Sequence, residues 1–440
     1  MNKLHSILVG LSLLFVFPGM AKAGMTPQRS VLENGLVLLT SEQKALPMVA
    51  LELLIDAGSR HDTQKEEGLA NLTSKLLIHG TKQRTSLQIS ETLDFIGANL
   101  STRCARDVAS VSMTILKKDL AVGLELLADI LTSSVFPQEE IDRQKQAVIA
   151  SIKAKEEEPG SIAQRKFSEA LFPESRYGRP VEGNEASVNA IQQSRLKQFY
   201  ERHYRPNRAI LAVVGDISHQ EITHALNQAF PSWAKGEAAE PYTRPTAAGS
   251  AQVVRLNKDL TQANIILGHE GVPRDHPDYY AIQVMNYILG GGGFSSRVMD
   301  SIRNERGLAY SVYSYFSAEK SHGAFELVMQ TKNETAQEAI SIAKREITRM
   351  REQSVSDEEL KDAKDYLIGS FPLRLDTNRR VAAFLAQVEF FQLGLDFQDR
   401  YADFIRKVSK EDVLRVAKRY LYPDKLLTVI VGNLKKMGDN

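Results

Sequence analysis

Two histidines at helical spacing would be the plainest sign of a metal site among the histidines of this sequence. Two histidines four positions apart on a helix lie one above the other, as in the zinc-binding H-x-x-E-H motif. The chain has 9 histidines, and none of them forms such a pair; they stand at positions 5, 61, 79, 203, 219, 224, 269, 276 and 322. We therefore expect none of them to bind zinc, and we expect His79 to be a part-buried residue on a helix.

A single cysteine and a run of glycines are the other features that could do chemistry. Cys104 is the only cysteine, so an internal disulfide is impossible even in an oxidising compartment. The run Gly290, Gly291, Gly292 and Gly293 lacks the following Gly-Lys-Ser/Thr of a P-loop. It also fails the dinucleotide-binding pattern, because Ser295 stands where the third glycine belongs.

The N-terminus is typical of a secretory signal peptide, predicted over residues 1–23. A basic start precedes an apolar run from Ile7 to Phe17, and Ala21-Lys22-Ala23 forms a small-x-small cleavage site. A short membrane anchor is the alternative, but the run is shorter than the roughly 20 residues that span a bilayer. We expect an exported protein without a stable membrane anchor, periplasmic if the source is a Gram-negative bacterium.

The remaining chain is predicted to be globular, with two domains. Its 440 residues suit two cores of about 200 residues each. Apolar residues make up 43% and charged residues 25% of the chain, which favours a packed core over disorder. The net charge of +1 gives no reason to expect nucleic acid as a partner.

An internal repeat supports this division. The segments HYRPNRAILAVVGD (203–216) and YLYPDKLLTVIVGN (420–433) align, and each is a turn followed by an apolar run that stops at glycine. Such runs predict buried strands, and an amphipathic helix precedes each one. A second aligned pair, at 136–141 and 355–360, has the acidic first turn of a helix.

The repeat fixes the predicted domains at residues 25–233 and 251–440, with a linker over 234–250 that is rich in Ala, Gly, Pro, Glu and Thr. Residues 102–116 and 324–331 are predicted to be strands or hairpin arms. Strands and helices do not alternate strictly, so we predict an α+β fold of two homologous domains. Each is expected to be a largely antiparallel sheet with helices packed on it.

Residues 57–81 and 289–312 resemble the M16 family of zinc metallopeptidases, which includes pitrilysin, insulysin and mitochondrial processing peptidase. The first segment, AGSRHDTQKEEGLANLTSKLLIHGT, has the family's Gly-Ser-Arg, Gly-x-Ala and terminal Gly-Thr. The second, LGGGGFSSRVMDSIRNERGLAYSV, has its glycine-rich loop and its Arg…Gly-Leu-x-Tyr segment. The resemblance covers about residues 28–434 and implies one half of a clamshell-shaped peptidase.

The zinc motif of that family is lost here. The resemblance places Asn71 and Lys75 at the two histidine positions of H-x-x-E-H and Ser74 at the position of its glutamate. Ser151 stands where the family has a third ligand, a glutamate on a later helix. Neutral Asn and Ser are poor zinc ligands and Lys75 is a cation, so we expect no metal and no other cofactor in this chain.

The resemblance also implies that Arg303 and Tyr310 are retained catalytic residues. In the family this pair faces zinc across a cleft, where a guanidinium and a phenol stabilise the charge that grows on the peptide carbonyl oxygen. Residues 295–306 are predicted to be a helix that stops at Gly307, with a strand starting at Tyr310. A surface arginine beside a core-edge tyrosine is the alternative, and Arg306 is the competing arginine.

Some family members divide these roles between two chains. The resemblance therefore predicts the non-zinc subunit of a heterodimeric metalloendopeptidase, inactive alone, whose partner bears H-x-x-E-H and zinc and whose substrate is an unfolded peptide. The alternative is an inert peptide-binding or structural homologue. The four glycines are either a flexible loop that binds substrate or a tight turn.

Overall fold

Two buried strands that follow proline-containing turns lie at matching places in two sheets. The computed structural model describes residues 25–437, so the predicted signal peptide lies outside the described residues. The strands β6 (Ala209–Gly215) and β11 (Leu427–Gly432) each follow a 3-10 turn, at Pro206–Arg208 and Pro423–Lys425. All residues of β11 and all but one of β6 are buried, as the apolar runs predicted.

The first sheet has six strands in the order β1-β2-β6-β3-β5-β4. Only β2 and β6 pair in parallel, and the other neighbours are antiparallel. The range 102–116, predicted to be one strand or hairpin arm, contains the end of β4 and all of β5, and a turn at 105–108 separates these two antiparallel strands. The remaining bounds are β1 (Gln28–Val31), β2 (Val37–Glu42), β3 (Met48–Ile55), β4 (Asn99–Cys104) and β5 (Ala109–Leu116).

The second sheet repeats this plan with five strands, in the order β7-β11-β8-β10-β9. Here β7 and β11 are the parallel pair, in the place that β2 and β6 take in the first sheet. The fold is therefore α+β with largely antiparallel sheets. The bounds are β7 (Gln252–Asn257), β8 (Gln262–Glu270), β9 (Ala309–Ala318) and β10 (Gly323–Lys332).

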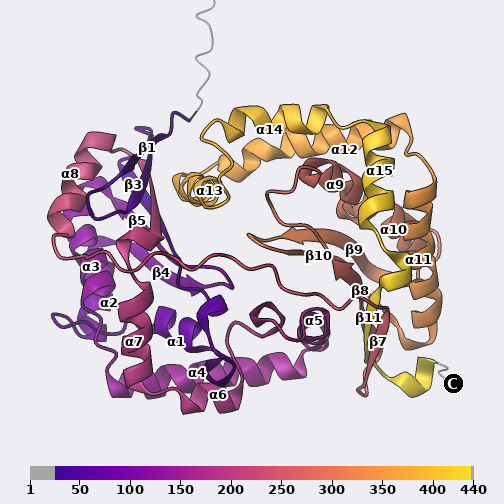
Figure 1. Ribbon diagram of the computed structural model, residues 1–440, viewed down its shortest axis with the longest axis horizontal. Coiled ribbons are helices and arrows are strands. Elements are labelled where there is room, and N and C mark those ends of the chain that lie inside the picture. The colour runs from indigo at the N-terminus through magenta and orange to yellow at the C-terminus, as the bar shows by residue number, and fades with distance from the viewer. Residues whose placement is uncertain (1–24, 438–440) are drawn as a thin grey trace, which may run out of the picture.

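Helices cover both sheets (Figure 1). Those before the linker are α1 (Leu69–Leu76), α2 (Ser86–Ile96), α3 (Leu120–Thr132), α4 (Gln138–Glu157), α5 (Pro159–Leu171), α6 (Glu185–Ala190), α7 (Gln193–His203) and α8 (His219–Ala229). Those after it are α9 (Tyr279–Asn286), α10 (Arg297–Met299), α11 (Ala336–Glu352), α12 (Asp357–Ser370), α13 (Asn378–Phe390), α14 (Phe397–Arg406) and α15 (Lys410–Tyr420).

One helix of each half packs on the sheet of the other half. Apolar residues of α5 pack on the second sheet, where Phe167 contacts the strands that contain Ile266 and Val429. Apolar residues of α13 pack on the first sheet, where Leu385 joins a cluster with Leu54. Figure 1 shows α13 beside the first sheet and α5 beside the second. Each sheet thus buries one face under its own helices and part of the other under a helix of the opposite half.

The linker connects the halves as an irregular segment. The structure has no helix or strand between Ala229 and Gln252. Arg208 donates hydrogen bonds to the carbonyl oxygens of Glu237 (2.9 Å) and Ala238 (2.7 Å), and this fixes the linker to the first half. Within residues 25–437, no helix has the length and apolar character needed to cross a membrane.

Candidate functional site

The helix α1 carries most of the degenerate zinc motif, and its start is set by Asp62. The carboxylate of Asp62 accepts hydrogen bonds from the backbone N–H groups of Gly68 (3.0 Å) and Ala70 (2.9 Å), which the first turn of the helix leaves unpaired. Gly68 has φ +90°, and a Cβ there would lie 2.5 Å from the carbonyl oxygen of Glu182. Burial raises the pKa of Asp62 to about 7.

Three of the four degenerate positions meet at one cavity. Asn71 and Lys75 lie one turn apart on α1, Ser151 lies on α4, and all three line a cavity of about 600 Å³. Ser74 points elsewhere, since it is 1% exposed and does not line the cavity. The cavity also reaches the second half of the chain, where Glu319 and Phe390 form part of its wall.

The side chains at this cavity do not fit a zinc ion. Asn71 presents a buried amide nitrogen without a hydrogen-bond partner, and Lys75 presents an ammonium group. Cys104 also lines the cavity, but burial raises its pKa and its thiol faces the carbonyl oxygen of Ala105 at 3.4 Å. No group of three or more His, Cys, Asp or Glu residues able to hold a metal occurs in residues 25–437.

The histidines near these elements have other contacts. His79 is part-buried beyond the end of α1, with Nδ1 3.1 Å from the hydroxyl of Ser86 and Nε2 3.0 Å from the side-chain amide of Gln144. The rings of His61 and His203 lie 4.2 Å apart, and burial lowers the pKa of His203 to about 3. Each of these rings therefore packs against, or hydrogen-bonds to, other residues of the first half.

Arg303 lies between two exposed aromatic rings. Its guanidinium carbon is 5.1 Å from the centre of the Tyr310 ring and 4.7 Å from that of Phe294. Tyr310 is 77% exposed and Phe294 68% exposed, so the three side chains form a stack open to solvent. The sequence pattern predicted Arg303 and Tyr310 but missed Phe294, although an aromatic residue directly after the glycine run was the available signal.

The local backbone explains how this stack forms. A π-helical turn over Asp300–Asn304 carries Arg303, and Gly307 at φ +63° ends it as predicted. The chain then enters β9 at Ala309, one residue before Tyr310. The regular helix is shorter than the predicted 295–306, because Gly293–Ser295 forms a separate 3-10 turn.

Arg306, the competing arginine, points back to its own turn. It donates a hydrogen bond to the carbonyl oxygen of Ser301 (2.6 Å) and pairs with Glu305 (2.7 Å). Among the two arginines, Arg303 is therefore the one that faces Tyr310.

The glycine run connects two helical turns, and the helix α9 rather than a strand precedes it. Gly290 and Gly291 end a π-helical turn (Tyr287–Gly291), and Gly293 begins a 3-10 turn (Gly293–Ser295). Gly290 is buried, and a Cβ there would lie 2.4 Å from the hydroxyl of Ser314 on β9. Gly293 has φ +59°, a conformation that other residues rarely adopt. Gly291 is exposed, so part of the run faces solvent beside Phe294. Substrate binding by these glycines stays a prediction.

Tyr310 and the degenerate cavity lie at opposite ends of β9. Tyr310 is near the start of the strand, whereas Glu319, which lines the cavity, directly follows its last residue. A strand advances roughly 3.3 Å per residue, so the two positions are about 30 Å apart. Within one chain, the Arg303 stack therefore cannot act on a peptide bond held at Asn71 and Lys75.

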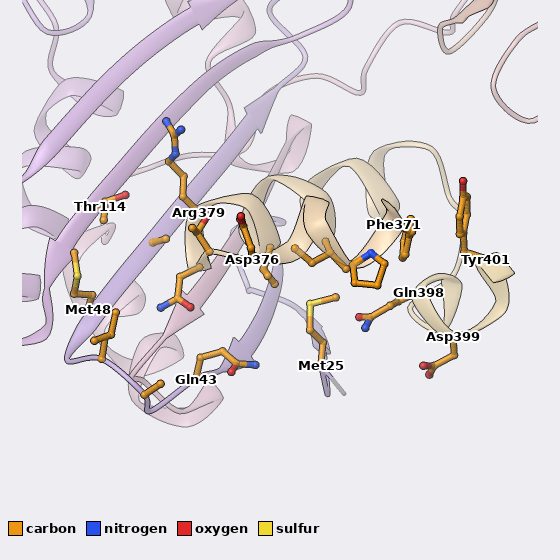
Figure 2. A pocket seen from close by; sticks show the side chains of 18 of the residues that line it. Met25, Gln43, Met48, Thr114, Phe371, Asp376, Arg379, Gln398, Asp399 and Tyr401 are labelled. Carbon is orange, nitrogen blue, oxygen red and sulfur yellow. The ribbon is translucent and has the colours of Figure 1, made fainter. Parts of the chain in front are cut away.

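A further cavity, of about 890 Å³, lies between the halves near the start of β3 and α13 (Figure 2). Met25 and Met48 come from the first half, and Phe371, Arg379 and Tyr401 come from the second. None of the predicted site residues lines it, and it is therefore a feature of the interface between the halves.

Comparison with known proteins gives consistent matches along the chain. Residues 37–185 match the family model described as insulinase (peptidase family M16), and residues 190–367 match the model described as peptidase M16 inactive domain. An uncharacterized zinc protease of Streptomyces coelicolor is 30% identical over 419 residues, which cover 93% of this chain and 90% of that protein.

Two other relatives are of the inactive kind. A non-peptidase homolog, YmxG, of Helicobacter pylori is 28% identical over 429 residues, covering 96% of this chain and 98% of that protein. A solved structure of a peptidase M16 inactive domain from Pseudomonas fluorescens superposes with a TM-score of 0.88 at 27% identity. That match covers 93% of this chain and 98% of the other.

Proposed function

The chain belongs to the M16 peptidase family as an inactive-type homologue, and from this premise we propose that it is the non-zinc subunit of a heterodimeric metalloendopeptidase. Its partner would be a second M16 chain with an intact H-x-x-E-H motif, which binds the zinc ion. The substrate would be an unfolded peptide enclosed between the two chains. The signal-peptide pattern of residues 1–23 supports export, and the periplasm is the proposed site of action if the source is a Gram-negative bacterium.

The exposed stack of Arg303 and Tyr310, far from the chain's own degenerate cavity, is the observation that carries this proposal. Both side chains end in strong hydrogen-bond donors; Tyr310 lies on β9, the edge strand of the second sheet, and Arg303 on the turn that precedes it. An edge strand is open to another chain. The pair is thus accessible to a site formed by a partner and inaccessible to the cavity at Asn71.

The chemistry of the pair suits peptide hydrolysis. As water attacks a peptide carbonyl, negative charge develops on the oxygen. The Tyr310 hydroxyl and the Arg303 guanidinium would donate hydrogen bonds to this oxygen, which stabilises the transition state more than the ground state. The partner's zinc would supply the activated water, and this chain would supply only the two donors and part of the peptide-binding surface.

A structural or peptide-binding role without catalysis is the second candidate. The relative named as a non-peptidase homolog favours it. The two candidates differ in whether a catalytic partner exists, because a structural protein does not need one.

Co-purification separates the two. The full-length chain, with residues 1–23 kept so that it is exported, carries a C-terminal tag and is isolated from its native source, and the co-purified proteins are identified and assayed for zinc and for cleavage of an unfolded peptide. We expect an H-x-x-E-H chain of the M16 family, with activity that exceeds that of either chain alone. An inactive, zinc-free chain without such a partner would contradict the proposal and favour the structural role.

A further inference from the structure

The cavity at the degenerate zinc position has an excess of unpaired positive charge. Lys75 of α1, Arg103 of β4 and Arg106 of the following turn all line it. No Asp or Glu of residues 25–437 lies within 4.0 Å of the charged nitrogens of these three residues. The cavity's fourth cation, Lys155, is already paired with Glu182.

The acidic groups of the cavity are fewer than its cations. One oxygen of Asp107 accepts a hydrogen bond from the Tyr177 hydroxyl at 2.8 Å, while its other oxygen is buried without a partner. Burial raises the pKa of Asp107 and that of Glu319, so both carboxyl groups bind protons more readily than in water. The lining thus has four cationic side chains, Lys75, Arg103, Arg106 and Lys155, against three carboxyl groups, so positive charge is in excess even when all three carboxyl groups are ionised.

Two buried donors also lack acceptors at this place. Asn71 is 9% exposed, and its side-chain nitrogen has no hydrogen-bond partner. The Nε atom of Arg106 is buried and unpaired as well. Buried donors without partners are costly, and an oxygen ligand in the cavity would satisfy them. The donors come from α1 and from the β4–β5 turn, so a ligand between these elements could bind both.

We propose that this cavity binds a carboxylate group of an extended peptide. A carboxylate has two oxygens that accept charge-assisted hydrogen bonds from arginine and lysine, which matches the unpaired donors. Arg103 lies on β4, the edge strand of the first sheet, so a peptide that runs along this edge would pass the cavity. Apolar side chains that also line the cavity, Val148, Phe390 and Phe391, would accommodate the rest of the peptide.

The carboxylate has two possible sources, namely the C-terminus of the peptide and an internal Asp or Glu side chain. Both present the same group, and the structure predicts the group rather than its source. Carboxylate binding at this cavity would involve this chain alone. It does not depend on a catalytic partner, and its failure would leave the proposed subunit role untouched.

Fluorescence anisotropy tests the proposal on the chain without residues 1–23. The probes are labelled, unstructured peptides of one neutral sequence with a free C-terminus, with an amidated C-terminus, and with an amidated C-terminus plus one internal Glu in place of Gln. We expect the free-acid peptide or the Glu peptide to bind at least about tenfold more tightly than the neutral amide. Which of the two does so identifies the source.

Variants link this preference to the cavity. Lys75→Gln removes an exposed cation and should reduce the preference for the carboxylate severalfold, and Arg106→Gln should reduce it further. Lys153→Gln is the matched control, because Lys153 is also an exposed lysine on a helix but does not line the cavity and pairs with Glu185. Circular dichroism melting verifies folding. Equal binding of all three peptides, or an unchanged preference in folded Lys75→Gln, would overturn the proposal.

Discussion

The guanidinium carbon of Arg303 lies 5.1 Å from the centre of the Tyr310 ring, although Tyr310 is 77% exposed. A cation beside an aromatic face holds a ring that would otherwise rotate freely in solvent. The hydroxyl of Tyr310, on the edge strand β9, and the guanidinium of Arg303, on the π-helical turn before it, are thereby presented together. The family resemblance implied that both residues are retained catalytic residues. Their spacing in the sequence alone did not predict that the two side chains are in contact.

Tyr310→Phe tests the hydroxyl without disturbing the ring. The variant keeps the contact with Arg303 and removes one hydrogen-bond donor. In the complex with an H-x-x-E-H partner, we expect kcat to fall by about 10²–10³, with little change in KM, as for loss of one transition-state donor. Steady-state kinetics on an unfolded peptide measure both constants.

Tyr313→Phe is the control for this experiment, because Tyr313 is 44% exposed on the same strand and is not in contact with Arg303. It should leave both constants unchanged. Equal activity of Tyr310→Phe and the wild-type complex would contradict the proposed role of Tyr310.

Phe294 is predicted to be a positioning residue for Arg303. Its ring centre lies 4.7 Å from the guanidinium carbon, and an exposed cation–π contact contributes about 0.5–1 kcal/mol. Phe294→Ala should therefore lower kcat of the complex by about twofold to fivefold. Phe294→Tyr should restore it, since the aromatic face returns. A loss that persists in Phe294→Tyr would show that Phe294 does not act through its ring.

The linker should detach when its aromatic contact is removed. Arg60 lies with its guanidinium carbon 4.1 Å from the Tyr242 ring centre and donates a hydrogen bond to the carbonyl oxygen of Glu240 (3.1 Å). Tyr242→Ala removes the ring that covers this contact, so limited proteolysis within 234–250 should become faster. Thr243→Ala is the control, since Thr243 is exposed. Equal cleavage rates would contradict a fixing role for Tyr242.

The sequence predicted the elements of each half better than the contacts between them. The turns at Pro206 and Pro423 and the apolar runs after them identified β6 and β11, because a run that stops at glycine is short enough for a buried strand. The conformation of Gly307 followed from its position after a helix. These predictions depend on local patterns, which a sequence displays directly.

The contacts between the halves could not be predicted in this way. An apolar face on α5 or α13 shows that the helix is buried, but not that it packs on the sheet of the opposite half. The sequence also could not predict that Lys75, Arg103 and Arg106 line one cavity, because Lys75 lies on a different element from the two arginines. Such features depend on tertiary arrangement rather than on spacing.

The packing of α5 on the second sheet predicts a large effect of one substitution. Phe167 is 1% exposed, and its ring fills the space above Gly268, where an added Cβ would lie 2.6 Å from the ring. Phe167→Ala should lower the free energy of unfolding by about 3–5 kcal/mol, as for other buried aromatic residues. Urea denaturation measures this loss. Phe95→Ala, at a position 91% exposed, should cost less than about 0.5 kcal/mol, and equal losses would contradict the packing argument.

Asp62 should make the stability of the chain depend on pH. Its carboxyl group is buried at the start of α1, and burial raises its pKa from 3.8 to about 7. Between these two values the folded state binds the proton and the unfolded state does not. The free energy of unfolding therefore falls as pH rises through this range, by up to about 1.4 kcal/mol per pH unit. The favourable contribution is complete below the unfolded pKa and lost above the folded one.

Asp62→Asn removes this titration while it keeps a side-chain oxygen that can accept from the N–H of Gly68 or Ala70. Urea denaturation of both proteins from about pH 5 to pH 8 isolates the contribution of Asp62, because other groups titrate equally in the two. We expect the stability of the wild type relative to the variant to decrease up to about pH 7 and then to level off. Parallel pH profiles would show that Asp62 is already ionised at pH 5 in the folded chain. Its two hydrogen bonds to the start of α1 would then stabilise the carboxylate more strongly than burial destabilises it.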